Sequence, residues 1–198
     1  MTATAVAPAM PLAGAGTLRD ARVESVVAAM RASPDDEHVS RGSEAGELMY
    51  LLCRALRARR VVDCGASSGL STLYLAAAVR DNGGGCVLGA EIEPRSIAAA
   101  RDRLRAAGLE AYVEWRCGDA RDTLRDTGND IDLVRIGLCG AAALQVLQLL
   151  APRMQGGAVV LADGGSSDYL AWVRDPASGM RSMRLSLRET IELSIKAA

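Results

Sequence analysis

The stretch Val61-Val62-Asp63-Cys64-Gly65-Ala66-Ser67-Ser68-Gly69-Leu70-Ser71-Thr72 decides the expected fold. A short apolar strand ends there in an acidic residue, and a turn of glycine and serine follows it and opens a helix. Glycines let a backbone approach a ligand closely, and the free N–H groups at the amino end of a helix attract an anion. The segment therefore predicts a ligand-binding loop, with a purely structural turn as the alternative.

Short apolar strands alternate with amphipathic helices after this turn. We expect strands at 60–64, 86–91, 112–116, 131–136 and 158–162, and helices at 44–57, 71–80, 94–107, 120–125 and 141–154. Each crossover helix hides one face of the strands that it joins, so the alternation requires a parallel sheet covered on both faces. The predicted fold class is α/β, a doubly wound Rossmann-like sheet.

The two ends of the chain depart from this rhythm. Residues 1–16 have no periodic pattern and are expected to form a disordered tail, and 17–32 predict a helical cap on a single domain spanning 17–198. Segments 180–187 and 190–196 alternate apolar and polar residues and predict an antiparallel hairpin at the sheet edge. This hairpin has more apolar surface than one helix hides, so we expect a homodimer; the alternative is a monomer in which the helix after Ser166 covers it.

The composition bounds the class of protein and of partner. The 198 residues suit one domain, and 49% hydrophobic with 24% charged residues is typical of a globular protein. Twenty-three basic against 24 acidic residues lack the footprint of a nucleic-acid binder, which favours a small-molecule partner. We expect no membrane span, because no apolar run approaches about 20 residues. No Lys or Arg occurs in the first ten residues, so we expect a cytoplasmic protein.

The five cysteines form no C-x-x-C pair, so disulfide and zinc frameworks are poor interpretations. We expect each of them to be a small buried apolar residue in a reducing compartment.

Two acidic residues lie beyond the carboxyl ends of the next predicted strands, where ligands bind in open α/β sheets. Glu91 ends the second strand, where a carboxylate accepts hydrogen bonds from a ribose diol, so a nucleoside-containing ligand is expected. Asp119 follows the third strand and could accept a hydrogen bond from an amino group such as that of adenine, or cap the helix from Ala120.

Together these elements resemble the class I S-adenosylmethionine-dependent methyltransferases. The closer resemblance is to the small O-methyltransferases related to the catechol and caffeoyl-coenzyme A enzymes, over about 39–196. It rests on the segments 65–71, 91–94 and 118–120 and on the Gly156-Gly157 turn before 159–163. The resemblance implies S-adenosylmethionine as cofactor and S-adenosylhomocysteine as product.

The resemblance also implies a set of cofactor-binding residues. Gly65 and Gly69 would lie under the methionine portion, Ser71 would bind its carboxylate, Glu91 the ribose and Asp119 the adenine amine. Residues 39–43 match a segment that closes over cofactor and substrate in that family. The full set of expected cofactor-binding residues is Ser40, Gly65, Ser67, Gly69, Ser71, Glu91, Asp119 and Ala120.

The sequence departs from the family where the family holds a divalent metal. There the fourth strand usually ends in Asp, with Lys three residues later as a base, and the fifth ends in Asp-Asn. Here Gly137 and Gly140 replace the first pair and Gly164 replaces the Asn, so Asp163 alone remains. A hard cation needs about six oxygen ligands, and we therefore expect no metal.

The remaining candidates for catalysis are few. His38 is the only histidine and the simplest general base near neutral pH, unless it is a surface residue. Asp163 is a second candidate, for contacting substrate or ordering the cofactor amine. Arg135, in an otherwise apolar strand, is either a substrate anchor or a solvated edge side chain.

Three functions remain open. The first is metal-independent methyl transfer to an oxygen, or less readily a nitrogen, of a small molecule, with specialised metabolism as the setting suggested by family analogy. The second is a protein that binds S-adenosylmethionine without methyl transfer, as a regulatory partner or as a catalyst of a rearrangement. The third, a nicotinamide-binding protein, is disfavoured because Ser67 fills the middle glycine of G-x-G-x-x-G.

Overall fold

The computed structural model describes Leu18 and residues 20–33, 43–187 and 189–198. Within them, one seven-stranded sheet has the order β3-β2-β1-β4-β5-β7-β6. The strands are β1 (Arg60–Cys64), β2 (Cys86–Glu91), β3 (Val113–Cys117), β4 (Ile131–Ile136), β5 (Met154–Asp163), β6 (Met180–Ser186) and β7 (Thr190–Lys196). Strands β1 to β5 pair in parallel, and β7 is antiparallel to both β5 and β6. The α/β fold class with a C-terminal hairpin is confirmed.

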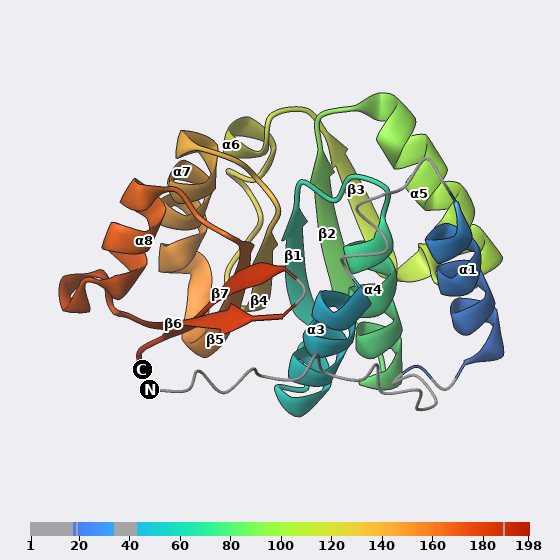
Figure 1. Ribbon diagram of the computed structural model, residues 1–198, viewed down its shortest axis with the longest axis horizontal. Helices are drawn as coiled ribbons and strands as arrows, with labels where there is room; N and C mark the ends of the chain where they lie inside the picture. Colours follow the sequence, from blue (N-terminus) through green and yellow to red (C-terminus); the bar gives the residue numbers. More distant parts are fainter. Residues whose placement is uncertain (1–17, 19, 34–42, 188) are drawn as a thin grey trace, which may run out of the picture.

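Helices cover both faces of the sheet (Figure 1). On one face lie α1 (Ala21–Ala32), α3 (Ser43–Ala55), α4 (Leu70–Asp81) and α5 (Pro94–Ala106). On the other lie α6 (Ala120–Thr123), α7 (Ala141–Leu150) and α8 (Ser167–Arg174). Strand alternation supplies both cores, because Val61 faces the first layer and Val62 the second.

Local chemistry moves some boundaries away from the expected ones. Helix α1 begins at Ala21 rather than at residue 17, because the Asp20 carboxylate accepts hydrogen bonds from the first-turn amides and caps the helix. Helix α7 ends at Leu150, since Pro152 lies in a short 3₁₀ turn before β5. Strand β5 begins at Met154, which pairs with Ile131 across a register shift. The predicted tail, 1–16, lies outside the described residues.

The close packing of α3 on α4 depends on one glycine. A Cβ atom at Gly46 in α3 would lie 2.4 Å from the ring of Tyr74 in α4. Helix α4 is buried along most of its length between α3 and the sheet. The absent side chain thus brings α3 over the amino end of α4, where the turn after β1 enters.

All five cysteines are free, but their burial differs from the expectation. Cys53 and Cys64 are buried, and burial raises the pKa of the Cys53 thiol to about 12, so it stays protonated at neutral pH. Cys86, Cys117 and Cys139 are exposed, so the expectation of burial is wrong for these three. Cys86 and Cys117 are terminal residues of their strands, where the covering helices no longer reach.

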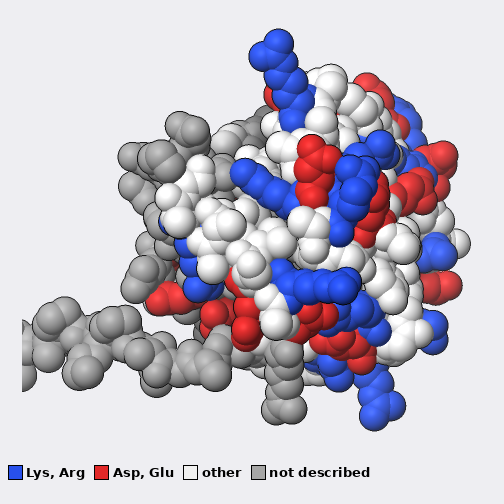
Figure 2. All heavy atoms as spheres, turned by 90° about the vertical axis from the view of Figure 1, so that its right-hand side faces the viewer, with Lys and Arg blue, Asp and Glu red and all other residues white. Residues whose placement is uncertain are grey.

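Charge on the molecular surface is mixed rather than segregated. On the face drawn in Figure 2, basic and acidic side chains lie among one another. Several charged side chains of the described residues form ion pairs, for example Arg105 with Asp102 and Glu110, and Arg80 with Asp20. This face shows no basic stripe of the kind that follows a nucleic-acid backbone. Among the helices in the described ranges, none is long and apolar enough to cross a membrane.

The C-terminal hairpin is covered differently on its two faces. Helix α8 packs against β6, and its Tyr169 and Val173 share a core with Met180. On the opposite face Ile191 is buried, whereas Met183 and Ile195 remain about half exposed. Helix α8 therefore covers one face of the hairpin and leaves the other incompletely covered.

A buried ion pair ties α8 to the hairpin. Glu192 of β7 is 1% exposed, and its two oxygens accept hydrogen bonds from Arg174 at 2.8 and 2.7 Å. The Ser182 hydroxyl donates to the same carboxylate at 2.6 Å. The Arg174 hydrogen bonds, helped by Ser182, outweigh burial and hold the pKa of Glu192 below its usual value.

We expect Arg174→Ala to destabilise the protein at neutral pH. Replacing Arg174 leaves the buried Glu192 carboxylate without its ion-pair partner, so the denaturation midpoint should fall, by less than for a fully buried pair because Arg174 is 45% exposed. A carboxylate with a lowered pKa stabilises the fold above its unfolded-state pKa, and this contribution disappears as the pH falls through its folded pKa. Denaturant titrations from pH 7 down to about pH 3 should therefore show the variant and the wild type converging in acid.

The exposed Arg101→Ala on α5 is the control and should leave stability unchanged. An Arg174→Ala loss that is the same at every pH would contradict the ion-pair explanation.

Candidate active site

The turn after β1 has a backbone that few residues adopt. Gly65 and Gly69 have φ of +71° and +86°, and Ser67 between them has φ of +47°. Side chains are also excluded by contact, since a Cβ at Gly69 would lie 2.6 Å from the Cβ of Ala100 in α5. A non-glycine residue at positive φ is strained, and such strain concentrates at binding sites. The turn is therefore held by its surroundings rather than by local preference.

The Glu91 carboxylate stabilises this turn through hydrogen bonds. One carboxylate oxygen accepts the Ser67 N–H at 2.8 Å, and the other accepts the amides of Ile92 at 2.8 Å and Glu93 at 3.0 Å. The side chain is 9% exposed at the end of β2, beside β1. Glu91 therefore fixes the strained residue of the turn from the neighbouring strand. A carboxylate offers about four acceptor positions, so one remains after these three bonds.

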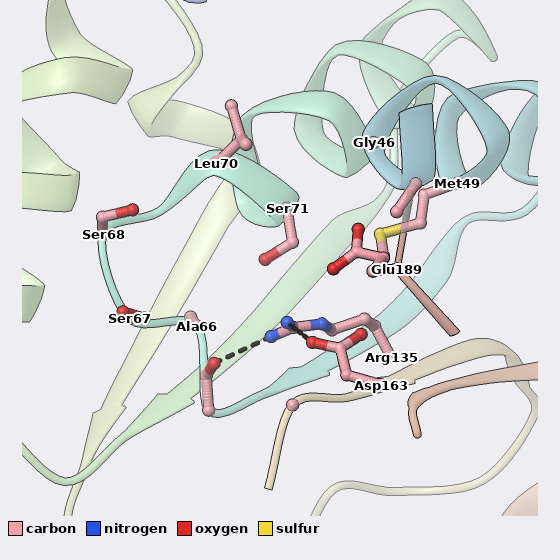
Figure 3. Close-up of a pocket in the computed structure, with 13 residues that line it drawn as sticks. Gly46, Met49, Ala66, Ser67, Ser68, Leu70, Ser71, Arg135, Asp163 and Glu189 are labelled. Atoms are coloured by element: carbon pink, nitrogen blue, oxygen red, sulfur yellow. Dashed lines mark hydrogen bonds and ion pairs between the residues drawn. The ribbon is translucent and has the colours of Figure 1, made fainter. Parts of the chain in front are cut away.

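A cavity of about 390 Å³ opens under this turn at the carboxyl edge of the sheet (Figure 3). It is bounded by the turn and the start of α4, by α3 at Met49, by the ends of β4 and β5, and by Glu189 between β6 and β7. The volume falls in the usual range of small-molecule sites. The expected position of the ligand site, beyond the ends of parallel strands, is where this cavity lies.

Three charged side chains meet at the base of the cavity, where Arg135 and Asp163 line it and Asp63 lies buried beneath them. Asp63, Arg135 and Asp163 extend from the adjacent strands β1, β4 and β5 on the same face, with Asp63 and Arg135 directly opposite one another. The Arg135 guanidinium forms an ion pair with Asp163 through Nη2, while Nη1 donates to the Gly65 carbonyl at 2.8 Å (Figure 3). Nη1 also lies 3.5 Å from Oδ1 of Asp63. Arg135 is thus a buried central residue, not a solvated edge side chain.

The pKa of Arg135 reflects this setting. Burial by itself would lower the pKa of the guanidinium, but the carboxylates of Asp163 and Asp63 outweigh burial and raise it. The side chain therefore remains charged at every pH at which the protein is folded.

Asp63 organises the start of α4. Its Oδ2 accepts hydrogen bonds from the Ser71 hydroxyl at 2.8 Å and the Thr72 hydroxyl at 2.7 Å. Its Oδ1 has no hydrogen-bond partner among the described residues and is fully buried. Because the Ser71 hydrogen points to Asp63, the hydroxyl presents its lone pairs to the cavity. The Ser71 hydroxyl is thus engaged as a donor to Asp63, and its expected role toward a cofactor carboxylate stays a prediction.

Asp119 caps the amino end of α6, which is one of the two roles expected for it. Its carboxylate accepts the Arg121 amide at 2.9 Å and pairs with the Arg121 side chain. The hydrogen bonds from Arg121 lower the pKa of Asp119 to about 2. Asp119 is therefore an anion at neutral pH, beside the end of β2 where the Gly118 amide donates to the Glu91 carbonyl.

The structure brings part of the predicted set to the cavity wall. Gly65, Ser67, Ser71 and Asp163 line it. Four others, Gly69, Glu91, Asp119 and Ala120, lie on the turn and on the neighbouring strand ends without lining it. Ser40 and His38 fall outside the described residues, so their roles stay predictions.

Sequence reasoning missed the wall opposite the turn. Ala45, Gly46 and Met49 of α3 and Glu189 of the hairpin loop also line the cavity. Gly46 and Met49 are one turn apart on α3, but no local pattern says that this side of the helix meets the site. The acidic end of β1, Asp63, was visible in the sequence without a stated role.

A divalent metal of the kind expected in the resembling family does not fit this site. Within the described residues, no three His, Cys, Asp or Glu side chains are grouped so as to hold a metal ion. The place of the missing ligand is also filled: a Cβ at Gly137 would lie 2.2 Å from Nη1 of Arg135. A side chain at position 137 would therefore push the guanidinium out of its contacts with Gly65 and Asp163.

Comparison with known proteins agrees with this architecture. Residues 62–164, about half of the chain, match a family model described as a methyltransferase domain. The chain belongs to this methyltransferase family. The match runs from the middle of β1 to the residue after β5 and includes the turn, Glu91, Asp119 and Asp163.

Among curated relatives of this chain, the catechol O-methyltransferase of Mycobacterium tuberculosis is 32% identical over 142 residues. That match covers 70% of this chain and 64% of the mycobacterial protein. Two solved structures share the fold. The SAH-bound Podospora anserina methyltransferase PaMTH1 has a TM-score of 0.74 at 16% identity, over 90% of this chain and 88% of that one. The O-methyltransferase TomG of Streptomyces achromogenes, in complex with SAM, has a TM-score of 0.70 at 21% identity, over 90% and 91%.

We expect Glu91→Gln to loosen the turn. Glutamine has a single acceptor oxygen, so it can accept the Ser67 N–H or the amides of Ile92 and Glu93 but not both sets, and hydrogen bonds to a charged group contribute about 1.5–3 kcal/mol. Hydrogen exchange at the amides of residues 67–69 should become faster, with a loss of global stability no greater than that range. Glu93→Gln, an exposed neighbour in the same loop, is the control. Unchanged exchange in the Glu91 variant would show that the turn holds its shape without this carboxylate.

Proposed function

We propose that the protein is an S-adenosylmethionine-dependent methyltransferase that methylates an oxygen, or less readily a nitrogen, of a small molecule. The observation that carries the proposal is the cavity under a strained glycine turn whose central amide is held by Glu91. Family membership supports methyl transfer. The names of the mycobacterial relative and of TomG support an oxygen acceptor and this cofactor.

The residues present fit the proposed cofactor. Its carboxylate suits the free amides at the start of α4, and its ammonium suits the lone pairs of Ser71. The remaining acceptor position of Glu91 suits a ribose hydroxyl, and the anionic Asp119 lies beyond it for an adenine amine. When bound, the sulfonium supplies a methyl group that is already activated, so the protein mainly has to align the acceptor.

Different residues of the chain would hold the cofactor and the methyl acceptor. The turn and α4 hold the donor end, and Met49 of α3 closes the cavity from the opposite wall. Asp163 is the ionisable side chain on β5 that can accept a hydrogen bond from an acceptor hydroxyl. In-line approach at about 3 Å accounts for a large share of such a rate. His38 is retained as a second candidate base.

We also propose that no metal takes part. One carboxylate at the ends of β4 and β5 is too few ligands for a hard cation, and the Arg135 guanidinium fills the adjacent space.

We propose a cytoplasmic location and a role in specialised metabolism. The free cysteines suit a reducing compartment such as the cytoplasm. Specialised metabolism is suggested by TomG, which is described as involved in tomaymycin synthesis.

Calorimetry and a turnover assay test the proposal together. We expect S-adenosylhomocysteine to bind and NAD not to bind, and Glu91→Ala to weaken binding by about tenfold or more, from a lost charged hydrogen bond. A panel of phenols, catechols and amines with labelled S-adenosylmethionine should yield a methylated product, and EDTA should not reduce the rate. Binding of S-adenosylhomocysteine without any methylated product would favour a protein that binds S-adenosylmethionine without methyl transfer. Binding of NAD alone would favour a nicotinamide-binding protein. Activity that is lost with EDTA and restored by magnesium would overturn metal independence.

We propose a homodimer formed through the less covered face of the hairpin. Met183 and Ile195 on that face are 57% and 44% exposed, and Leu51 of α3 is 51% exposed. Pairing with a second copy would remove such apolar surface from water. Light scattering at micromolar concentration should give about twice the mass of one chain, and Met183→Glu should shift it toward the monomer. A monomeric wild-type protein would exclude this assembly.

A further inference from the structure

Arg135 is an unusual residue for the centre of a parallel sheet. Its strand, β4, lies between β1 and β5, and the side chain is 13% exposed. A charge in such a place is costly unless it is paired and hydrogen bonded. Here it is paired twice, because Asp163 holds Nη2 and Asp63 lies 3.5 Å from Nη1.

Position 137 is adapted to this guanidinium. A Cβ there would lie 2.2, 2.4 and 2.6 Å from Nη1, Cζ and Nη2 of Arg135. The guanidinium therefore occupies the volume in which a side chain at position 137 would begin. Arginine at 135 and glycine at 137 depend on each other. Arginine with a side chain at 137 would produce a clash, and glycine without the arginine would leave a void between two carboxylates.

We propose that the Arg135 guanidinium takes the place of a divalent cation in this site, as a fixed positive charge that positions Asp163 for the methyl acceptor. This inference rests on the proposed function and names the residue that makes the metal unnecessary. Arg135 is a positioning residue, and Asp163 is the group that contacts the acceptor.

The arrangement leaves Asp163 usable. Arg135 engages Oδ2, and none of the described residues hydrogen bonds to Oδ1, while the carboxylate lines the cavity. Oδ1 accepts the hydrogen bond of the acceptor hydroxyl. As the acceptor oxygen forms its bond to the methyl carbon, the carbon–sulfur bond breaks with its electron pair moving to sulfur. The hydroxyl proton passes to Asp163 and then to water.

The charge of the cluster selects the acceptor. One guanidinium and two carboxylates sum to a negative charge, so an acceptor that already carries a negative charge is disfavoured at this end of the cavity. The proposal therefore commits to neutral hydroxyl or amine donors. A metal in the same place would instead favour a bound oxyanion.

A variant series tests the cation replacement without any acceptor. Gly137→Asp alone should lower the melting temperature, because the new side chain meets the guanidinium. Adding Arg135→Ala should recover part of that loss and create a Mn²⁺ site, since the introduced carboxylate, Asp163 and the unpartnered Oδ1 of Asp63 then face one emptied volume. Electron paramagnetic resonance should show Mn²⁺ binding at least about tenfold tighter in the double variant than in the wild type.

The control is Arg101→Ala, which removes an exposed arginine on α5 and should change neither property. A folded double variant that binds Mn²⁺ no better than the wild type would overturn the proposal. If the double variant does not fold, Gly137→Ala decides: it should destabilise the wild type and be tolerated when Arg135 is replaced by Ala, and equal effects in both backgrounds would also overturn the proposal.

Turnover kinetics of Arg135 variants test whether this residue positions Asp163. With the acceptor that the panel yields, Arg135→Met should reduce kcat by about tenfold or more, while the affinity for S-adenosylhomocysteine changes less. Arg135→Lys should restore part of kcat. Wild-type protein that fails to bind S-adenosylhomocysteine would refute the proposed function, whereas a wild type and an Arg135→Met variant that are equally active would refute only the role of Arg135.

Discussion

A guanidinium placed between the central strands of a parallel sheet constrains everything around it. Arg135 needs carboxylates on both neighbouring strands, and β1 and β5 supply them as Asp63 and Asp163. Its remaining contact, to the Gly65 carbonyl, ties the same charge to the turn that enters α4. The ends of three strands and the floor of the cavity are thus fixed by one residue that cannot lose its proton.

The turn after β1 is stabilised by carboxylates on β1 and β2. Glu91 reaches across from β2 to the strained Ser67 amide, and Asp63 reaches forward to the first hydroxyls of α4. These bonds come from different strands, so the turn keeps its shape only when the sheet is assembled. A preorganised site of this kind spends little free energy on ordering itself when a ligand binds.

Membership of the methyltransferase family and the departures from the resembling enzymes are explained by the same geometry. The match to the family model includes the turn after β1, Glu91 and Asp119, whereas beside Gly137 at the end of β4 the space is filled by the Arg135 guanidinium. Chemistry and specificity can therefore diverge within one fold by changes at the loops beyond the strands.

The sequence by itself determined the order of elements, the parallel sheet with its terminal hairpin, and the turn at 65–69. These follow from apolar periodicity and from glycine, which act over a few residues. The helix-capping role of Asp119 was also visible, because its partner Arg121 is two residues away. Tertiary structure alone decided the role of Arg135, since strand register places it opposite Asp63 and no local pattern encodes that register. It also decided that α3 and Glu189 line the cavity, and that the Ser71 hydroxyl turns to Asp63, because these contacts join segments that are brought together only by packing of the whole sheet.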